Sequence, residues 1–490
     1  MKNKIIVPSE IKNITETLQE AGFEAYLVGG CVRDILIGRE PKDWDVTTNA
    51  KPEEIQKLFP NTYYTNKFGT VGVVNEKFSC ETLKVIEVTP YRIESEYSDF
   101  RHPDEVIFTT NLQDDLKRRD FTMNAIAYDP SKGHLVDPYK GQEDIKDMIV
   151  RAVGIPSDRF REDALRILRA VRFSIELGFA ISSETIEAME KESELVKKIS
   201  AERICDEFTK IIMSDNPMGG VIICQQLSIL NFILPELEKG MGLTQNSDHI
   251  YDIWEHSLRA LNHSAERKWP LPVRLAALLH DVGKVPTRDW NKEKNDWTFY
   301  GHDVVGERIT RKILERLKYP NKIIDKVTKL VRNHMFFTDI DKITLSAVRR
   351  IVRNVGPENV WDLMNVRACD RIGMGRPKEA PYRLRKYESM IEEAMRAPVS
   401  VGMLKIDGAK IMEVTKLTAG PKIGFILHAL LEEALDNPDL NTEEYLQKRA
   451  IEMSKLPEKE LAELGEKGKE KKTELETKEI TKIRSKYGVK

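Results

Sequence analysis

The chain has 490 residues, enough for about two to four domains with cores of their own. Charged residues make up 32% of it, yet the formal net charge is only −2, so any nucleic-acid surface must be a local patch. The cysteines show no C-x-x-C spacing, which fits thiols used as small core residues in a reducing cytoplasm. No apolar run reaches about 18 residues, so we expect a cytoplasmic protein that does not span a membrane.

Strand and helix signals alternate over about the first 135 residues. An amphipathic helix is expected over residues 9–21, where Ile11, Ile14 and Leu18 share one face. Candidate strands, separated by Gly, Pro and polar turns, follow at residues 25–28, 44–47, 70–74 and 83–89. This pattern predicts an α/β head domain, residues 1–150, with a small mixed sheet and helices. Beyond residue 182 the strong periods are helical, which predicts an all-α remainder.

The chain is organised around LVGGCVRDILIGREPKDWDVTT, residues 27–48. An apolar strand ends at Gly29 and Gly30, where the backbone can turn tightly and approach a phosphate. A second strand then carries Asp43 and Asp45, and residues two apart in a strand point to the same face. Such neighbouring carboxylates repel unless a cation lies between them, and hard oxygen ligands suit Mg²⁺. The alternative is that both are ordinary turn or surface acids.

Glu87 lies near the end of the alternating strand LKVIEVT. It is either an edge-strand acid or a third carboxylate beside Asp43 and Asp45. The segment that follows, YRIESEYSDFRHP at residues 91–103, is polar, aromatic and basic without an apolar period. We therefore expect a mobile loop next to the site.

An arginine-rich helix is expected over residues 161–173, REDALRILRAVRF. Asp163, Arg166, Arg169 and Arg172 recur every three residues and form a slowly drifting stripe opposite a packed apolar side. A charge run on a helix is often only a solvated face. Here every cation is Arg, which makes planar bidentate hydrogen bonds, so the stripe is a candidate binding surface.

These stretches, together with DLKRRDFTMNAIAYD at residues 115–129, resemble the nucleotidyltransferase superfamily that includes poly(A) polymerases and the bacterial-type class of tRNA CCA-adding enzymes. The resemblance implies that Asp43 and Asp45 hold the Mg²⁺ that activates a primer 3′-hydroxyl, with Glu87 as a third catalytic carboxylate. It implies that the glycine turn and the basic motif contact the nucleotide through Gly29, Gly30, Arg33, Arg119, Asp120 and Asn124. Similar enzymes use the loop at residues 91–103 to switch from adding C to adding A.

The string E-D-x-x-R is similar to the family's base-reading motif. The resemblance implies that Asp163 and Arg166 read CTP or ATP in place of a template. An acid accepts a hydrogen bond from the exocyclic amine that C and A share, whereas U and G present a carbonyl there. An unsatisfied acid costs roughly 1–3 kcal/mol, which would reject the wrong base. Arg169 and Arg172 are then expected to hold phosphate or ribose.

A second constellation lies within residues 246–375. His280 and Asp281 adjoin each other at the end of an apolar helix, which is more specific than a lone histidine. The stretch resembles the HD superfamily of metal-dependent phosphohydrolases. The resemblance implies a metal site of Mn²⁺, Ni²⁺, Co²⁺ or Fe²⁺ whose ligands are His256, His280, Asp281 and Asp370, with His302 and His334 as the extra ligands of two-metal members. The expected reaction is hydrolysis of a phosphomonoester or a 2′,3′-cyclic phosphate at an RNA 3′ end; the alternative is a decayed domain that only helps to bind tRNA.

The resemblance also suggests how the rest of the chain is divided. We expect a helical neck at residues 151–245, the HD domain at 246–375 and a helical tRNA-binding tail at 376–454. Residues 455–490 have nearly balanced charge and few apolar side chains, which predicts a solvated helix or a disordered extension.

The expected function is template-independent addition or repair of the 3′ CCA of tRNA from CTP and ATP with Mg²⁺. A poly(A) polymerase, or an enzyme that adds only CC or only A, is the alternative within this class. An alternative of another class is an RNA-end phosphohydrolase whose main activity is the HD site.

Overall fold

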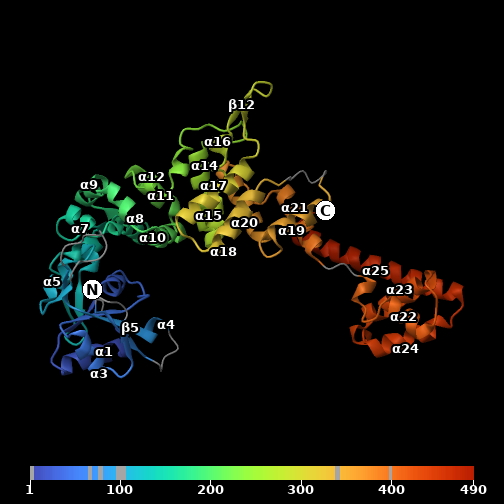
Figure 1. Cartoon of the computed structure of the whole chain (residues 1–490), viewed down its shortest axis with the longest axis horizontal. Helices are drawn as coiled ribbons and strands as arrows, with labels where there is room; N and C mark the ends of the chain where they lie inside the picture. The colour runs from blue at the N-terminus through green and yellow to red at the C-terminus, as the bar shows by residue number, and fades with distance from the viewer. Residues whose placement is uncertain are drawn as a thin grey trace. The chain divides into compact units, whose positions relative to one another are not determined.

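The computed structural model describes residues 5–64, 69–75, 81–94, 106–336, 343–396 and 400–489. The chain forms two compact units, one of Met1–His334 with Asn365–Pro377 and one of Met335–Met364 with Lys378–Lys490. In the first unit, a mixed sheet with helices is followed by helices and two small strand pairs (Figure 1). Among the helices in the described part of the chain, none is long and apolar enough to cross a membrane.

A seven-stranded sheet forms the head, in the order β3-β4-β5-β2-β1-β8-β9. β2 and β5 run parallel, whereas the other neighbouring pairs in it are antiparallel. Apolar side chains of helix α1 and of the central strands, such as Ile11, Leu27 and Val46, are fully buried against each other, which contributes about 1.5–3 kcal/mol for each side chain. The strands are β1 (Ala25–Val28), β2 (Asp45–Thr48), β3 (Thr62–Tyr64), β4 (Val71–Val74), β5 (Val85–Pro90), β8 (Ala127–Asp129) and β9 (His134–Val136).

The elements expected at the start of the chain are found with small shifts at their ends. The helix expected at residues 9–21 is α1, and the expected strands are β1, β2, β4 and β5, although Leu83 and Lys84 belong to a short helix instead. The remaining head elements are α1 (Ser9–Glu20), α2 (Gly30–Leu36), α3 (Pro52–Leu58), α4 (Glu81–Lys84), β6 (Arg92–Glu94), β7 (Val106–Phe108), α5 (Leu112–Lys117), η1 (Thr122–Asn124) and α6 (Gly141–Lys146).

The neck contains a break that the sequence pattern did not predict. The continuous helix expected at residues 161–173 is wrong, because α7 ends at Glu162 and α8 begins at Leu165. Asp163 between them has extended backbone angles, φ −141° and ψ 102°, and its Oδ1 accepts a hydrogen bond from the backbone N–H of Leu165 at 3.0 Å. An aspartate that bonds a nearby backbone N–H competes with the helix and ends it. Asp163 therefore does not belong to one helical stripe with the arginines that follow.

The other neck elements complete a helical layer. They are β10 (Ile149–Val150), α7 (Pro156–Glu162), α8 (Leu165–Leu177), β11 (Ala180–Ile181), α9 (Ser183–Lys191), η2 (Ser193–Lys198), α10 (Ala201–Met213), α11 (Pro217–Gln226), α12 (Leu230–Ile233) and α13 (Pro235–Glu238).

Helices and a hairpin follow the neck in the first unit. They are α14 (Ile253–Glu266), α15 (Leu271–Leu279), α16 (Lys284–Thr287), β12 (Asp289–Asn291), β13 (Asp296–Thr298), α17 (His302–Arg316), α18 (Asn321–Asn333) and the second half of α20 (Val360–Gly373). A histidine or aspartate lies at or near the end of most of these helices, so the helix ends can converge on one point.

The second unit is helical throughout its described residues. Its further elements are α19 (Leu345–Val355), α21 (Tyr382–Met395), η3 (Val401–Met403), α22 (Gly408–Thr415), α23 (Pro421–Asp436), η4 (Pro438–Leu440), α24 (Glu443–Ser454) and α25 (Glu458–Lys486). Of the two alternatives for residues 455–490, the helix is found and the disordered extension is wrong. α25 is packed rather than solvated along its first half, because Gly465 and Gly468 let it lie against the backbone of Phe425 and His428 in α23.

Candidate functional site

Three carboxylates meet at the edge shared by β2 and β5. The parallel register places Asp45 directly opposite Glu87. Burial, helped by the charges of Glu87 and Asp43, raises the pKa of Asp45 to about 6, although Arg119 opposes the shift. Burial and the charge of Asp43 also raise the pKa of Glu87. A divalent cation between these carboxylates would balance the negative charges that raise the pKa values of Asp45 and Glu87, so the donor set fits a magnesium site.

Asp43 reaches this group differently from what the sequence pattern indicated. The prediction that Asp43 and Asp45 alternate along one strand is wrong, because β2 begins only at Asp45. Asp43 is an exposed residue in the bend before the strand. Trp44 between them is buried in the core, which anchors the bend and keeps Asp43 within electrostatic range of the other two carboxylates.

A glycine turn faces the carboxylates. Gly29 has φ +81°, which a side-chain-bearing residue adopts only under strain. A Cβ at this position would lie 3.2 Å from Arg119 Nη1 and 3.4 Å from Asp45 Oδ2. The bare backbone of the turn, the Arg119 guanidinium and the Asp45 carboxylate thus surround one point, an arrangement that suits a triphosphate and its cation.

The buried carboxylate of Asp115 orients Arg119 toward this point. Asp115 is fully buried and accepts hydrogen bonds from Arg118 Nη2 at 2.6 Å and Arg119 Nη2 at 3.1 Å. Although burial alone would raise it, the pKa of Asp115 is lowered by these two guanidinium groups. Asp115 is therefore a positioning residue, which the motif contained but the sequence argument did not single out.

A chain of hydrogen bonds joins the head to the neck. Arg33 donates to Asn124 Oδ1 at 2.9 Å, and Asn124 donates to Asp120 Oδ1 at 3.0 Å. Asp120 Oδ2 accepts from Arg169 Nε at 2.8 Å and from Arg169 Nη2 at 2.6 Å. Burial alone would raise the pKa of Asp120, but Arg169 and Asn124 lower it. Four of the predicted nucleotide contacts thus form a single network between α2 and α8.

Phe173 lies at the centre of the arginines. The guanidinium carbons of Arg172, Arg33 and Arg169 lie 4.1, 5.0 and 5.3 Å from the centroid of its ring. Arg172 itself donates to Glu207 Oε2 at 2.6 Å and to Glu176 Oε2 at 3.0 Å. The sequence analysis gave this phenylalanine no role, and only its place at the end of the arginine run could have drawn attention to it.

Asp163 and Arg166, the predicted base-reading pair, are held by different partners. Asp163 Oδ1 and Oδ2 accept from Arg203 Nη1 at 3.0 Å and Nη2 at 2.7 Å. Arg166 donates to Glu162 Oε2 at 2.7 Å and to the carbonyl oxygen of Arg118 at 2.8 Å. Arg203, on α10, was missed, although SAERICDEFTKIIM at residues 200–213 also resembles a family motif.

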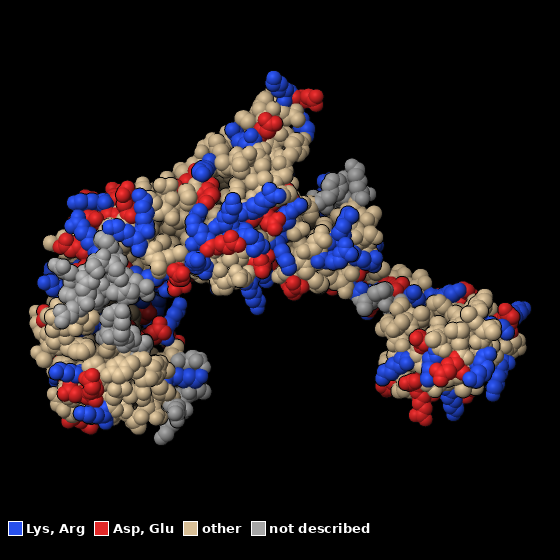
Figure 2. All heavy atoms as spheres, viewed as in Figure 1, with Lys and Arg blue, Asp and Glu red and all other residues tan. Residues whose placement is uncertain are grey.

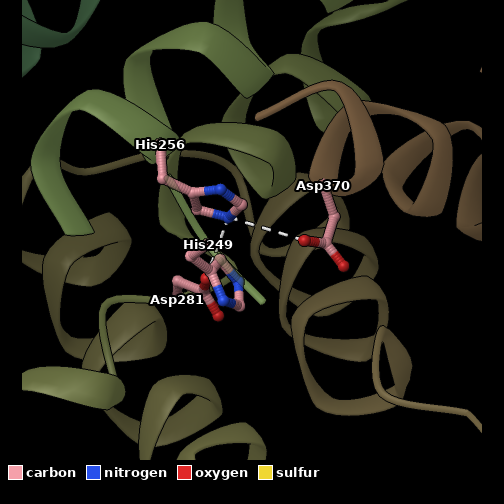
Figure 3. A group of neighbouring side chains, drawn as sticks. All are labelled: His249, His256, Asp281 and Asp370. Atoms are coloured by element: carbon pink, nitrogen blue, oxygen red, sulfur yellow. Dashed lines mark ion pairs between the residues drawn. The ribbon is translucent and has the colours of Figure 1, made fainter. Parts of the chain in front are cut away.

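The second site collects the six predicted HD residues around Asp281. Its Oδ2 lies 2.9 Å from His256 Nε2 and 3.3 Å from His280 Nε2, whereas its Oδ1 lies 3.5 Å from His302 Nε2 and 3.6 Å from His334 Nε2. Asp370 Oδ1 lies 3.5 Å from His256 Nε2 on the first side (Figure 3). Asp281 thus belongs to two groups of ligand atoms, as a bridging carboxylate would.

Backbone carbonyl oxygens fix the orientation of three of the histidine rings. Each of three rings places Nδ1 against a backbone carbonyl three residues earlier, at 2.8 Å for His280, 2.7 Å for His302 and 2.6 Å for His334. A proton on Nδ1 that donates to a carbonyl leaves the lone pair of Nε2 for a metal. The donor set, imidazole nitrogens with one shared carboxylate, therefore fits a pair of transition-metal ions.

The two buried carboxylates of this centre favour positive charge beside them. Burial alone would lower the pKa of His280, but Asp281 and Asp370 raise it to about 10. Burial lowers the pKa of His256. The carboxylates thus hold a proton on His280, and a metal ion that replaced it would release that proton.

Two further side chains lie at the group of ligand atoms around His256 and Asp370: His249 as a member and Lys284 beside it. His249, which no motif singled out as a ligand, contributes a ligand atom within 4.8 Å of those of His256, Asp281 and Asp370 (Figure 3). Burial, with Lys284 next, lowers the pKa of His249 to about 3, so its imidazole is neutral. Lys284 is buried and lies 2.7 Å from Asp281 Oδ2. The only sequence signal for His249 is its place one heptad before His256.

Most of the loop predicted at residues 91–103 lies outside the described residues. Within them, residues 92–94 are not loop as expected but form β6, which pairs with β7 so that Arg92 lies opposite Phe108.

Three protein-family models match parts of the chain. The poly A polymerase head domain matches residues 25–151, the probable RNA and SrmB-binding site of polymerase A matches residues 178–241, and the HD domain matches residues 253–372. Together with the carboxylates beside a glycine turn, these matches define a nucleotidyltransferase with a fused HD domain.

Named relatives narrow the class. A CCA-adding enzyme of Geobacillus stearothermophilus is 32% identical over 92% of this chain and 98% of its own length. One from Lactobacillus helveticus is 50% identical over 40% of this chain and 48% of its own length. A crystal structure of the Bacillus stearothermophilus CCA-adding enzyme in complex with CTP has 29% identity and a TM-score of 0.58, covering 91% of this chain and 98% of that chain. The chain belongs to the family of CCA-adding enzymes.

Proposed function

We propose that the head and neck add or repair the 3′ CCA of tRNA from CTP and ATP without a template. The observation that carries this proposal is the orientation of Asp163 by Arg203. A carboxylate has about four acceptor positions. In Asp163 the N–H of Leu165 and two nitrogens of Arg203 occupy three of them. The remaining position on Oδ2 accepts from the exocyclic amine of C or A and meets a carbonyl in U or G.

Asp43, Asp45 and Glu87 hold Mg²⁺ in this proposal. The bound ion supplies positive charge to the attacking and leaving oxygens of nucleotidyl transfer. Arg119, pinned by Asp115, binds the triphosphate beside the bare backbone of Gly29 and Gly30. The network from Arg33 to Arg169 fixes the distance between this phosphate site and the base-reading pair.

Sequencing the products formed on a tRNA that ends at its discriminator base, given CTP and ATP together, tests this proposal. We expect CCA, with no product from Asp43→Ala. A run of A would identify a poly(A) polymerase, and products ending in CC, or A added only to tRNA-CC, would identify the partial enzymes. UTP incorporation by wild type at the rate of CTP would contradict base selection by Asp163.

The HD centre supports a second activity, hydrolysis of a phosphomonoester or a 2′,3′-cyclic phosphate at an RNA 3′ end. The observation in its favour is that Asp281 faces two groups of ligand atoms. In the cyclic case water adds hydroxide to phosphorus, the bond from phosphorus to O2′ or O3′ breaks, and the released oxygen takes the proton. Bound Mn²⁺, Ni²⁺, Co²⁺ or Fe²⁺ would supply Lewis acidity and lower the pKa of water, while the histidines and carboxylates hold the ions.

Release of phosphate or opening of a cyclic end in the presence of each metal tests this second activity. We expect it to be lost in His280→Ala and retained in Asp43→Ala, because the two centres are built from separate residues. If this hydrolysis exceeds nucleotide addition on the same RNA, the HD site is the main activity. If wild type shows none, the HD centre is a decayed domain that serves only tRNA binding.

A further inference from the structure

The β12–β13 hairpin projects from the helices around it in the first unit (Figure 1). It is inserted between two HD ligands, Asp281 and His302. Trp290 lies opposite Trp297 across the hairpin, and their rings meet edge to face with centroids 5.0 Å apart. Arg288 stacks its guanidinium carbon 3.4 Å from the centroid of Trp297. The outer aromatic groups stay open to solvent, because Trp290 is 43% and Tyr300 is 72% exposed.

The base of the hairpin is tied to the metal centre. The carbonyl of Phe299 accepts from the backbone N–H of His302 at 3.2 Å and lies 2.7 Å from His302 Nδ1. On the other side, Asp296 accepts from Ser247 N at 3.0 Å and Oγ at 2.9 Å. Two residues before Ser247, Gln245 accepts from Lys284 Nζ at 2.7 Å. The hairpin and the ligand cluster are therefore one continuous structure.

Large aromatic side chains on a projecting hairpin gain little from the fold when they remain in water. The tip carries basic and acidic side chains side by side (Figure 2), among them Lys292, Glu293 and Lys294. This mixed charge attracts phosphate only weakly. What the surface offers is flat π faces flanked by cations, Arg288 at the base and Lys294 3.1 Å from Tyr300 Oη, and such faces stack on any base.

We infer that the hairpin is a stacking platform for the single-stranded 3′ end of RNA whose terminal phosphate enters the HD centre. The substrate of the HD site is then an RNA end with unpaired bases upstream of the phosphate, not a mononucleotide. This inference rests on the hydrolase proposed above. Stacking is tolerant of base identity, so the sequence of those bases matters little.

The test compares two substrates on the full-length protein with Mn²⁺. One is a short RNA of about five nucleotides ending in a 2′,3′-cyclic phosphate, and the other is cytidine 2′,3′-cyclic phosphate. For Trp290→Ala and Tyr300→Ala we expect the KM for the RNA to rise roughly tenfold with kcat unchanged, and no change for the mononucleotide. Trp290→Phe keeps an aromatic face and should stay close to wild type. Tyr382→Ala removes an equally exposed aromatic group from α21 and serves as the control.

Two results overturn the inference: an equal loss on both substrates, which reports damage to the metal centre, or an unchanged KM for the RNA. If wild type hydrolyses neither substrate with Mn²⁺, Ni²⁺, Co²⁺ or Fe²⁺, the hydrolase proposal fails. A measurement of RNA binding then tests the role of the hairpin separately. Titration of the protein into the same RNA, carrying a 3′-phosphate and a 5′ fluorophore, should then raise the fluorescence anisotropy of the RNA, with Trp290→Ala binding roughly tenfold more weakly than wild type. No binding by wild type, or equal binding by Trp290→Ala, including the case in which the hairpin captures a protein instead, rejects the platform.

Discussion

Arg203 donates two parallel hydrogen bonds to the carboxylate of Asp163, 3.0 Å to Oδ1 and 2.7 Å to Oδ2. The pair joins α10 to the break between α7 and α8, and both side chains are about one-fifth exposed. A bidentate contact fixes the plane of the carboxylate as well as its position. The acceptor that remains on Oδ2 is therefore presented in one direction, as reading a base edge requires.

Arg203→Lys should reduce base selection more than it reduces catalysis. Lysine keeps the charge but is a point donor that cannot hold both oxygens. We expect discrimination between CTP and UTP to fall about tenfold, which corresponds to about 1.4 kcal/mol, and kcat for CTP to change less. Competition between the two triphosphates on tRNA lacking CCA measures this effect. Arg161→Lys disturbs a comparable arginine–glutamate pair with Glu192 and should leave discrimination intact; equal behaviour of the two variants would refute the role of Arg203.

The raised pKa of Asp45 predicts how pH and Mg²⁺ act together. A folded-state pKa of about 6 lies above the ordinary value, so the folded protein binds the proton more tightly than the unfolded chain. This contribution to stability is present at low pH and is lost as pH rises through about 6. Mg²⁺ binds only the ionised form. Mg²⁺ should therefore raise Tm at pH 7.5 and have little effect at pH 5.

Asp45→Asn should abolish the response of Tm to Mg²⁺ at both pH values, since an amide neither titrates nor binds the ion well. Glu53→Gln changes an exposed acid of α3 in the same domain and should behave like wild type. A response to Mg²⁺ at pH 7.5 that survives in Asp45→Asn would place the ion elsewhere.

The periodic apolar patterns of the sequence correctly predicted a helix and strands of the head. The predictions that were wrong at the candidate sites concern particular polar residues. Alternation and apolar spacing located α1 and the central strands. The helix break could not be read from spacing, because an aspartate can occupy a helix or end it, and the choice depends on whether Leu165 N and Arg203 are within reach. The same limit applies to Asp43, whose position follows from the burial of Trp44 and not from strand alternation.

For the candidate sites, the sequence predicted which residues come together but not the hydrogen-bond networks that hold them. The six predicted HD residues converge because their motif fixes residue types at helix ends. Arg203 was missed because a distant segment brings it to Asp163, and His249 was missed because a single heptad spacing before His256 is a weak pattern. Long-range pairs of this kind depend on the packing of whole helices, which spacing does not encode.

Asp281 should control both metal positions of the HD centre. It is the residue shared by the two ligand groups found in the described part of the chain. We expect about two ions per chain in wild type loaded with Mn²⁺, about one in His334→Ala, and none bound tightly in Asp281→Asn. Elemental analysis after gel filtration measures the ratio. Asp303→Asn, next to a ligand but paired with Arg332, is the control; a loss of only one ion in Asp281→Asn would mean that the carboxylate does not bridge.

Two glycines of the second unit should respond oppositely to alanine. A Cβ at Gly468 would lie 2.1 Å from the carbonyl oxygen of His428, whereas at Gly424 no heavy atom of the described residues lies within 4 Å. Gly424→Ala should stabilise α23 by about 0.5–1 kcal/mol through helix propensity. Gly468→Ala makes the same gain in α25 but forces the two helices apart, at a cost of about 1–3 kcal/mol. Urea unfolding of both variants measures the difference, and equal stabilisation would show that α25 does not pack on α23.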